Sequence, residues 1–122
     1  MDTRGKIVAA ETLPALAIHR PVAVTGYFDV LTPAHVAELE ALAGGGKLVA
    51  IVLPLEGELL SQRARAELAA ALRAVDRVVA AEDSDPSRLL ATLQPSRVVR
   101  LEAADLRRRS ELIEDVRRHR HA

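Results

Sequence analysis

The sequence predicts an α/β fold in which a short parallel sheet of about four strands is covered by helices on both faces. Four short apolar runs read continuously instead of alternating with polar residues, which is typical of strands buried on both faces. These runs alternate with segments whose apolar residues recur at helical spacing, an order typical of parallel sheets with helical crossovers. The length of 122 residues fits one domain, residues 1–122, with one core.

Caps and breakers place the elements along the chain. Thr32 and Pro33 predict the N-cap and first residue of a helix that three consecutive glycines end, and Asp85 with Pro86 predicts a second such start. The predicted strands cover residues 21–25, 48–53, 78–80 and 97–101, and the predicted helices cover 33–43, 58–74, 85–93 and 105–119. An N-terminal helix over 11–18, interrupted by Pro14, is also expected. The apolar face is expected at Leu60, Ala64, Leu68 and Leu72 in the helix 58–74, and at Leu106, Leu112, Ile113 and Val116 in the last helix.

Composition excludes several classes of function. Aromatic residues make up only 2% of the chain, which argues against a stacking platform for single-stranded nucleic acid. The 17 basic and 17 acidic side chains balance, so no overall field attracts nucleic acid or a membrane, and any anion site must be local. Without cysteine the chain has no disulfide, thiolate metal site or cysteine nucleophile. No membrane-spanning stretch or secretory signal is recognised, so a cytoplasmic location is expected.

The loop after the first predicted strand is the expected ligand site. Open parallel sheets bind ligands beyond the carboxyl ends of their strands, and this strand ends at Thr25 and Gly26. A glycine lets backbone approach a bound group closely, and His35 falls in the first turn of a helix, beside free N–H groups that suit a phosphate. Asp29 is expected to position the loop by accepting backbone N–H groups. The simpler alternative is that Asp29 and Thr32 only fold the turn and that His35 is a partly exposed helix residue.

Residues 25–35, T-G-Y-F-D-V-L-T-P-A-H, resemble the nucleotide-binding loop of the HxGH nucleotidyltransferases, which reads T-G-C-F-D in related enzymes. The similarity continues through R-A-E-L at 65–68 and L-R-A-V-D at 72–76, and is closest to the bacterial heptose 1-phosphate adenylyltransferase domain. This resemblance implies a Rossmann-like (HUP-type) three-layer sandwich. It also implies transfer of AMP or CMP from ATP or CTP to a sugar or polyol phosphate, with release of pyrophosphate and with Mg²⁺ accompanying the triphosphate. A homodimer is expected, because relatives often pair.

The resemblance carries over to individual residues. His35 matches the second histidine of the motif and is the expected catalytic residue, while Thr32 stands at the position of the first histidine. The positions implied to bind nucleotide or phosphate are Thr25, Gly26, Tyr27, Phe28, Asp29, Ala34, Arg65 and Arg100. No residue is expected to bind a metal directly.

The departures from the motif fall on the chemistry. Thr32 carries no charge, and Ala34, in place of glycine, crowds a close approach to phosphate. The lysine loop after the second strand is missing, with Arg63 or Arg65 as partial replacements, and the family's final phosphate-gripping segment is absent, so the domain is expected to be C-terminally truncated. Losing one charge-stabilising group costs about 3–4 kcal/mol of barrier. Weak or absent catalysis is therefore expected, with a catalytically degenerate nucleotide-binding or protein-interaction module as the alternative.

Two basic runs lie in the last predicted helix. Arg107, Arg108 and Arg109 precede three acidic residues closely, which predicts a solvated face of mixed charge rather than a phosphate contact. His119 and His121 lie in the terminal R-R-H-R-H run, which predicts a solvated helix end whose cations complement the helix dipole.

Overall fold

The computed structural model describes residues 2–16 and 20–120, and it confirms the predicted α/β fold. The strands are β1 (Val22–Gly26), β2 (Leu48–Val52), β3 (Arg77–Ala80) and β4 (Arg97–Arg100). The α-helices are α1 (Pro33–Ala43), α2 (Gln62–Ala70), α3 (Ser87–Leu93) and α4 (Glu102–Arg120). Two 3₁₀ helices, η1 (Thr3–Lys6) and η2 (Ala10–Leu16), precede the first strand.

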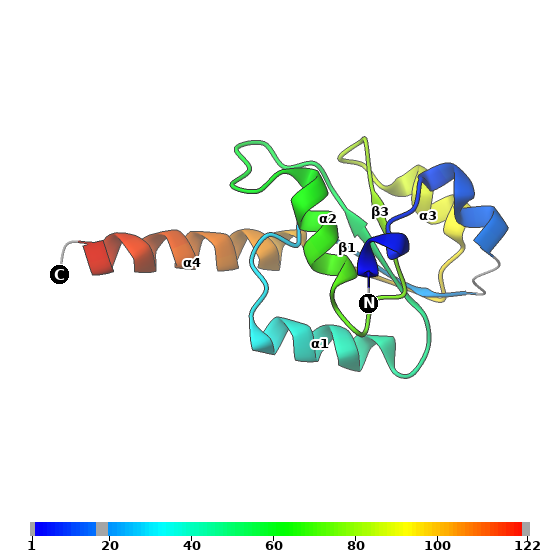
Figure 1. Ribbon diagram of the computed structural model, residues 1–122, viewed down its shortest axis with the longest axis horizontal. Coiled ribbons are helices and arrows are strands. Elements are labelled where there is room, and N and C mark those ends of the chain that lie inside the picture. Colours follow the sequence, from blue (N-terminus) through cyan, green and yellow to red (C-terminus); the bar gives the residue numbers. More distant parts are fainter. Residues whose placement is uncertain (1, 17–19, 121–122) are drawn as a thin grey trace.

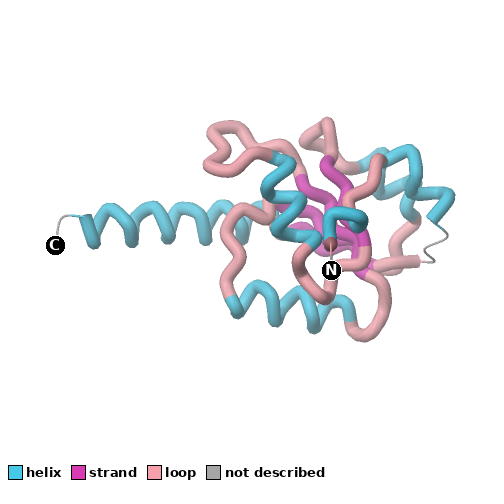
Figure 2. The backbone as a smooth tube through the Cα atoms, in the orientation of Figure 1, coloured by secondary structure: helices cyan, strands magenta, loops and turns pink. Residues whose placement is uncertain are grey.

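The four strands form one parallel sheet in the order β3-β2-β1-β4 (Figure 2). Gly26 at the end of β1 lies opposite Val52 of β2, and Thr25 lies opposite Arg100 of β4. The chain adds β2 and β3 on one side of β1 and then returns to add β4 on the other side. The strand order therefore reverses between β1 and β4, and this reversal marks the expected ligand edge.

Each face of the sheet is covered by its own apolar layer around β1, β2 and β3. The predicted burial on both faces is wrong for β4, an edge strand in which Val98 is 42% exposed. Val24, Ala50 and Val78 point to the side of α1 and α2, where Leu39, Ala66, Ala69 and Ala70 complete the larger cluster. On the other face, Ala23, Val49 and Val79 pack with Leu13 of η2 and with Leu93 of α3. Figure 1 shows these helices on the two sides of the strands. The alternation along each strand produces the Rossmann-like sandwich, because neighbouring side chains of a strand point to opposite faces.

The predicted cap of α1 is confirmed, whereas the cap predicted at Asp85 is wrong, because Pro86 occupies the N-cap position of α3. The Thr32 hydroxyl accepts the His35 N–H at 3.2 Å, and Pro33 is the first residue of α1. Gly44 ends that helix in the left-handed region at φ 55°. At α3, the Asp85 carboxylate accepts the Ser87 N–H at 3.0 Å, although the helix begins at Ser87 rather than at Asp85.

The helix predicted over residues 58–74 is shorter and faces differently. Only Gln62–Ala70 is helical, after an N-cap at Ser61. The buried face is formed by alanines and Arg65, while Leu68 is exposed and Leu60 lies outside the helix. Small residues are buried here because they let α2 pack closely on the sheet. At the N-terminus, the expected α-helix over 11–18 is instead η2, and residues 17 and 18 of that prediction lie outside the described residues.

Helix α4 starts at Glu102, earlier than predicted, directly after β4 and Leu101. Its first turns lie against the body, and the remainder extends away from it as one long helix (Figure 1). The expected apolar stripe is not buried in this chain, since Leu106, Leu112 and Val116 are each more than two-fifths exposed. Neither α4 nor any other helix in the described part of the chain is long and apolar enough to cross a membrane.

Candidate functional site

The polar residues of the predicted site meet where β1 and β4 end. The loop after β1 provides Tyr27, Phe28 and Asp29, and α1 provides His35. The first turns of α4, which follow β4 directly, bring Asp105 and two arginines to the same place. The site therefore combines three segments that are far apart in sequence, because the sheet order puts β4 next to β1.

Asp105 positions the loop, a role expected of Asp29. Its Oδ2 accepts the Tyr27 N–H at 2.8 Å and, more weakly, the Phe28 N–H at 3.5 Å. A Cβ on Gly26 would lie 2.5 Å from the same oxygen. Gly26 thus permits a close approach, as expected, but the approaching group is a carboxylate of the protein. Asp29 makes no hydrogen bond within the described part of the chain, and its Oδ2 lies 3.7 Å from Arg109 Nε.

His35 is a buried residue, so the simpler expectation of a partly exposed helix residue is wrong. Its side chain stacks against Phe28 with ring centroids 6.3 Å apart, and its Nε2 lies 3.4 Å from Nη2 of Arg108. Burial and the nearby Arg108 charge lower the pKa of His35, while burial raises the pKa of Asp105. The imidazole is therefore neutral at pH 7 and serves as a hydrogen-bonding group, not as a source of charge.

The start of α1 offers fewer free N–H groups than the sequence suggested. Pro33 has no N–H, the Thr32 hydroxyl accepts that of His35, and the Thr32 carbonyl accepts that of Val36 at 3.0 Å. The residue at the lost histidine position thus works as a helix cap. Ala34, which stands at the glycine position of the motif, is exposed on the first turn. The helix start alone is consequently a weak anion site, and positive charge must come from another element.

Two arginines of α4 provide that charge. Arg108 forms an ion pair with Asp105, and Arg109 donates to the Gly57 carbonyl at 2.6 Å and faces Asp29. Their side chains are 18% and 23% exposed, whereas Arg107 is exposed. The predicted solvated face is therefore correct for Arg107 and wrong for its two neighbours. Local charge pattern misses this difference, because only the position of β4 turns one side of α4 toward the loop.

Arg65 makes structural contacts inside the protein and does not face the site. Its buried guanidinium donates to the carbonyls of Leu53 at 2.8 Å and Tyr27 at 3.1 Å, and it pairs with Glu58 at 3.0 Å. These contacts tie the loops after β1 and β2 together. Arg63, the other candidate for the missing lysine loop, is exposed and pairs with Glu67 on its own helix.

The remaining predicted positions lie at the same edge with structural contacts. Thr25 is buried and its hydroxyl bonds to Glu102, which also pairs with Arg100 at 3.0 Å. This arrangement joins the start of α4 to β1 and leaves Arg100 about half exposed. Phe28 is buried in the left-handed region at φ 55°, a costly backbone state for a non-glycine residue that is often found at ligand-binding loops.

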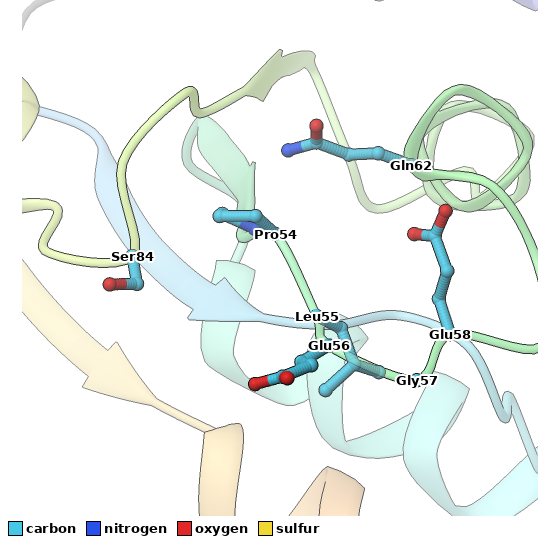
Figure 3. Close-up of a pocket in the computed structure, with 7 residues that line it drawn as sticks. All are labelled: Pro54, Leu55, Glu56, Gly57, Glu58, Gln62 and Ser84. Carbon is cyan, nitrogen blue, oxygen red and sulfur yellow. The ribbon is translucent and has the colours of Figure 1, made fainter.

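A depression opens beyond β2 and β3 at the same edge of the sheet (Figure 3). It is lined by Pro54, Leu55, Glu56, Gly57, Glu58, Gln62 and Ser84. Its ionisable side chains are both carboxylates, so it repels phosphate, in contrast to the arginine-lined region beside it. Gly57 belongs to both regions, because its carbonyl accepts from Arg109.

The fold and this edge define a Rossmann-like α/β domain with a polar site at the β1–β4 switch point. No protein-family model matches the chain. Part of the chain is similar to the bifunctional protein HldE of several bacteria. HldE of Rhodopseudomonas palustris strain TIE-1 is 41% identical over 85 residues, which are 62% of this chain and 17% of that protein. HldE of Rhodopseudomonas palustris strain BisA53 is 38% identical over 112 residues, which are 78% of this chain and 23% of that protein. HldE of Geobacter sulfurreducens is 33% identical over 110 residues, which are 82% of this chain and 22% of that protein.

The chain spans about a fifth of the length of these curated relatives. It therefore contains a region related to part of HldE. The similarity extends over more than half of the chain in each case.

His35 should make the stability of the protein depend on pH. The unfolded chain protonates this histidine near pH 6.5, while the folded pKa is lower, so the unfolded state binds more protons below that pH. Chemical denaturation of the wild type and of His35→Gln between pH 7.5 and 5 measures this. The wild type should lose stability relative to His35→Gln as the pH falls, since Asp105 is present in both proteins. A difference that does not change with pH, or that grows in the wild type's favour on acidification, contradicts a buried neutral His35.

Proposed function

We propose that this chain is a nucleotidyltransferase-type domain that binds a nucleotide phosphate at the β1–β4 edge and transfers AMP or CMP weakly or not at all. The observation that carries the proposal is the position of Arg108 and Arg109, which provide positive charge beside the loop that resembles a nucleotide-binding loop. The similarity of the chain to part of HldE supports the same assignment.

The polar groups suit a ligand with both phosphate and hydroxyl groups. The Nε atoms of Arg108 and Arg109 are buried without hydrogen-bond partners among the described residues, as are both carboxylate oxygens of Asp29. Buried polar groups of this kind are usually satisfied by water or a ligand. The arginines would donate to phosphate oxygens, and Asp29 would accept from a hydroxyl group, such as one on a sugar ring. A nucleotide or a sugar phosphate presents both.

Transfer itself requires charge at the leaving pyrophosphate. An acceptor phosphate would attack the α-phosphate in line, and the protein would contribute position and positive charge rather than covalent chemistry. Thr32 cannot provide charge, His35 is neutral, and Arg108 is already paired with Asp105. Each missing charge-stabilising group lowers the rate about 10²- to 10³-fold. Binding is therefore proposed with little or no turnover.

Magnesium would enter this site with the triphosphate. In the described part of the chain, no three His, Asp or Glu side chains are grouped so that they could hold a metal ion. The protein's own residues are proposed to bind and orient the nucleotide.

The proposed binding site predicts that two neighbouring arginines differ in importance. Arg109→Gln should weaken binding of ATP or CTP about tenfold or more, because a charged hydrogen bond to phosphate contributes about 1.5–3 kcal/mol. Arg107→Gln removes the same charge from the exposed side of the same helix and should change the Kd less than about threefold. Isothermal titration calorimetry of the wild type and both variants measures the effect.

The outcomes separate contact from overall charge. Equal weakening by both variants contradicts the assignment of Arg109 to the site. Absence of binding by folded wild-type protein contradicts nucleotide binding altogether. A pyrophosphate-release assay with ATP or CTP and a panel of sugar phosphates then reports whether any bound nucleotide reacts.

The alternative function is a protein-interaction module. It is supported by the distal part of α4, where Leu112 and Val116 are exposed on a helix that extends from the body (Figure 1). The partner expected from the sequence is a second copy of the chain, and this homodimer stays a prediction. A cytoplasmic location is likewise retained as a proposal.

A further inference from the structure

The amide groups of the loop after β1 already hold an anion. Tyr27 N–H and Phe28 N–H point to one oxygen, Oδ2 of Asp105, at 2.8 and 3.5 Å. Successive N–H groups that converge in this way form a concave anion-binding site, and the left-handed backbone of Phe28 helps to bring them together. The protein's own carboxylate thus occupies a position that suits a phosphate oxygen.

We propose that Asp105 is a built-in competitor for this amide pair, so that the first turn of α4 closes the anion site until a phosphate group displaces the carboxylate. The proposal rests on the proposed function, because it concerns regulation of the same site. A phosphate oxygen and a carboxylate oxygen cannot share the two N–H groups, since both are negatively charged acceptors that repel each other.

The second oxygen of the same carboxylate strengthens the closure. Asp105 Oδ1 pairs with Nη2 of Arg108, and the same nitrogen lies 3.4 Å from His35 Nε2. Asp105 therefore engages both the N–H groups and one of the two site arginines, and release would make them available together. Its side chain is 2% exposed, and burial raises the pKa of its carboxyl group, so the ionised form is held at a desolvation cost.

The position of Asp105 on α4 provides a route for release. Polar contacts join the start of α4 to the body, among them Asp105 with the loop, Glu102 with Thr25, and Arg109 with Gly57. Beyond these residues the helix extends away from the sheet (Figure 1). A small displacement of the first turn, or a rotamer change of Asp105, would open the amide pair.

The experiment measures inorganic pyrophosphate and ATP binding by calorimetry to the wild type, Asp105→Asn and a charge control. Asn keeps an oxygen that can accept from the loop but loses the charge, so both ligands should bind at least tenfold more tightly. Glu38→Gln is the charge control, because Glu38 lies on the exposed side of α1 and its charge also acts on His35. This variant removes one negative charge without touching the loop, and it should change the Kd less than threefold. Asp105→Ser serves as a second neutral variant, and circular dichroism checks that each protein is folded.

The outcomes distinguish this proposal from the proposed function. Tighter binding by Asp105→Asn or Asp105→Ser, but not by Glu38→Gln, supports a competing carboxylate. This holds even if the wild type shows no detectable binding, a result that by itself contradicts the proposed nucleotide binding by the wild type. If the wild type binds and neither Asp105 variant binds more tightly, or if Glu38→Gln tightens binding equally, Asp105 does not compete with the ligand. The proposed function stands in that case. No binding by any folded variant overturns both. In a wild type that binds, the ¹³C signal of the Asp105 carboxyl group should shift on saturation, and an unchanged signal also overturns the competitor.

Discussion

Replacing Arg65 with methionine should lower the free energy of unfolding by about 3–5 kcal/mol. Methionine fills a similar space with a flexible apolar chain, so the effect isolates the polar contacts. The variant leaves the buried carbonyl of Leu53 and the partly buried carbonyl of Tyr27 without their donor, and each unsatisfied buried group costs about 1–3 kcal/mol. The partly exposed Glu58 loses its partner at smaller cost, because water replaces it.

A matched control lies on the same helix. Arg63→Met makes the same chemical change at an exposed position, where the arginine pairs only with Glu67. Exposed pairs of this kind contribute about 0.3–0.5 kcal/mol, so the midpoint of urea denaturation should hardly move. If both variants lose the same amount of stability, Arg65 does not tie the loops together as described.

Replacing Gly26 with alanine should destabilise the protein by about 2–4 kcal/mol. The added Cβ would meet Asp105 Oδ2 at 2.5 Å, a distance that real contacts do not tolerate. Moving the carboxylate away costs its hydrogen bond to Tyr27 N–H and its ion pair with Arg108, and without a bound phosphate nothing replaces these contacts. The variant therefore strains the backbone or breaks the contact between α4 and the loop.

Gly5→Ala is the control for the glycine substitution. An added Cβ at Gly5 meets no atom within 4 Å, so its effect is limited to backbone propensity, about 1 kcal/mol or less. Urea denaturation of both variants gives the comparison. A Gly26→Ala protein as stable as Gly5→Ala contradicts the tight approach of Asp105 to the loop.

Much of the fold follows from local pattern. Continuous apolar strands predict burial on both faces, and the cap at Thr32, the proline after it and Gly44 define α1 almost to the residue. Helix α2 is less predictable, because the spacing of its leucines suggested a face that the alanines and Arg65 occupy instead. A buried arginine is invisible to hydrophobic periodicity, which treats every cation as solvent-facing.

The location of the site was predictable, but its key contacts were not. The end of β1 and His35 follow from the sheet rule and the motif resemblance. Asp105, Arg108 and Arg109 act on that loop from more than seventy residues away, and only the placement of β4 beside β1 brings them there. The sequence signal that could have predicted these contacts is one of position, because the charged residues lie in the first turns after a strand that borders the switch point.

Titration of the isotope-labelled protein with ATP, followed by ¹H–¹⁵N NMR, tests whether phosphate binds at the β1–β4 edge, beside the cations of α4. We expect saturable shifts at the amides of Tyr27, Phe28 and His35 and at the Nε groups of Arg108 and Arg109. Shifts confined to the acidic depression around Glu56 and Gln62, or no shifts in a folded sample, would contradict it.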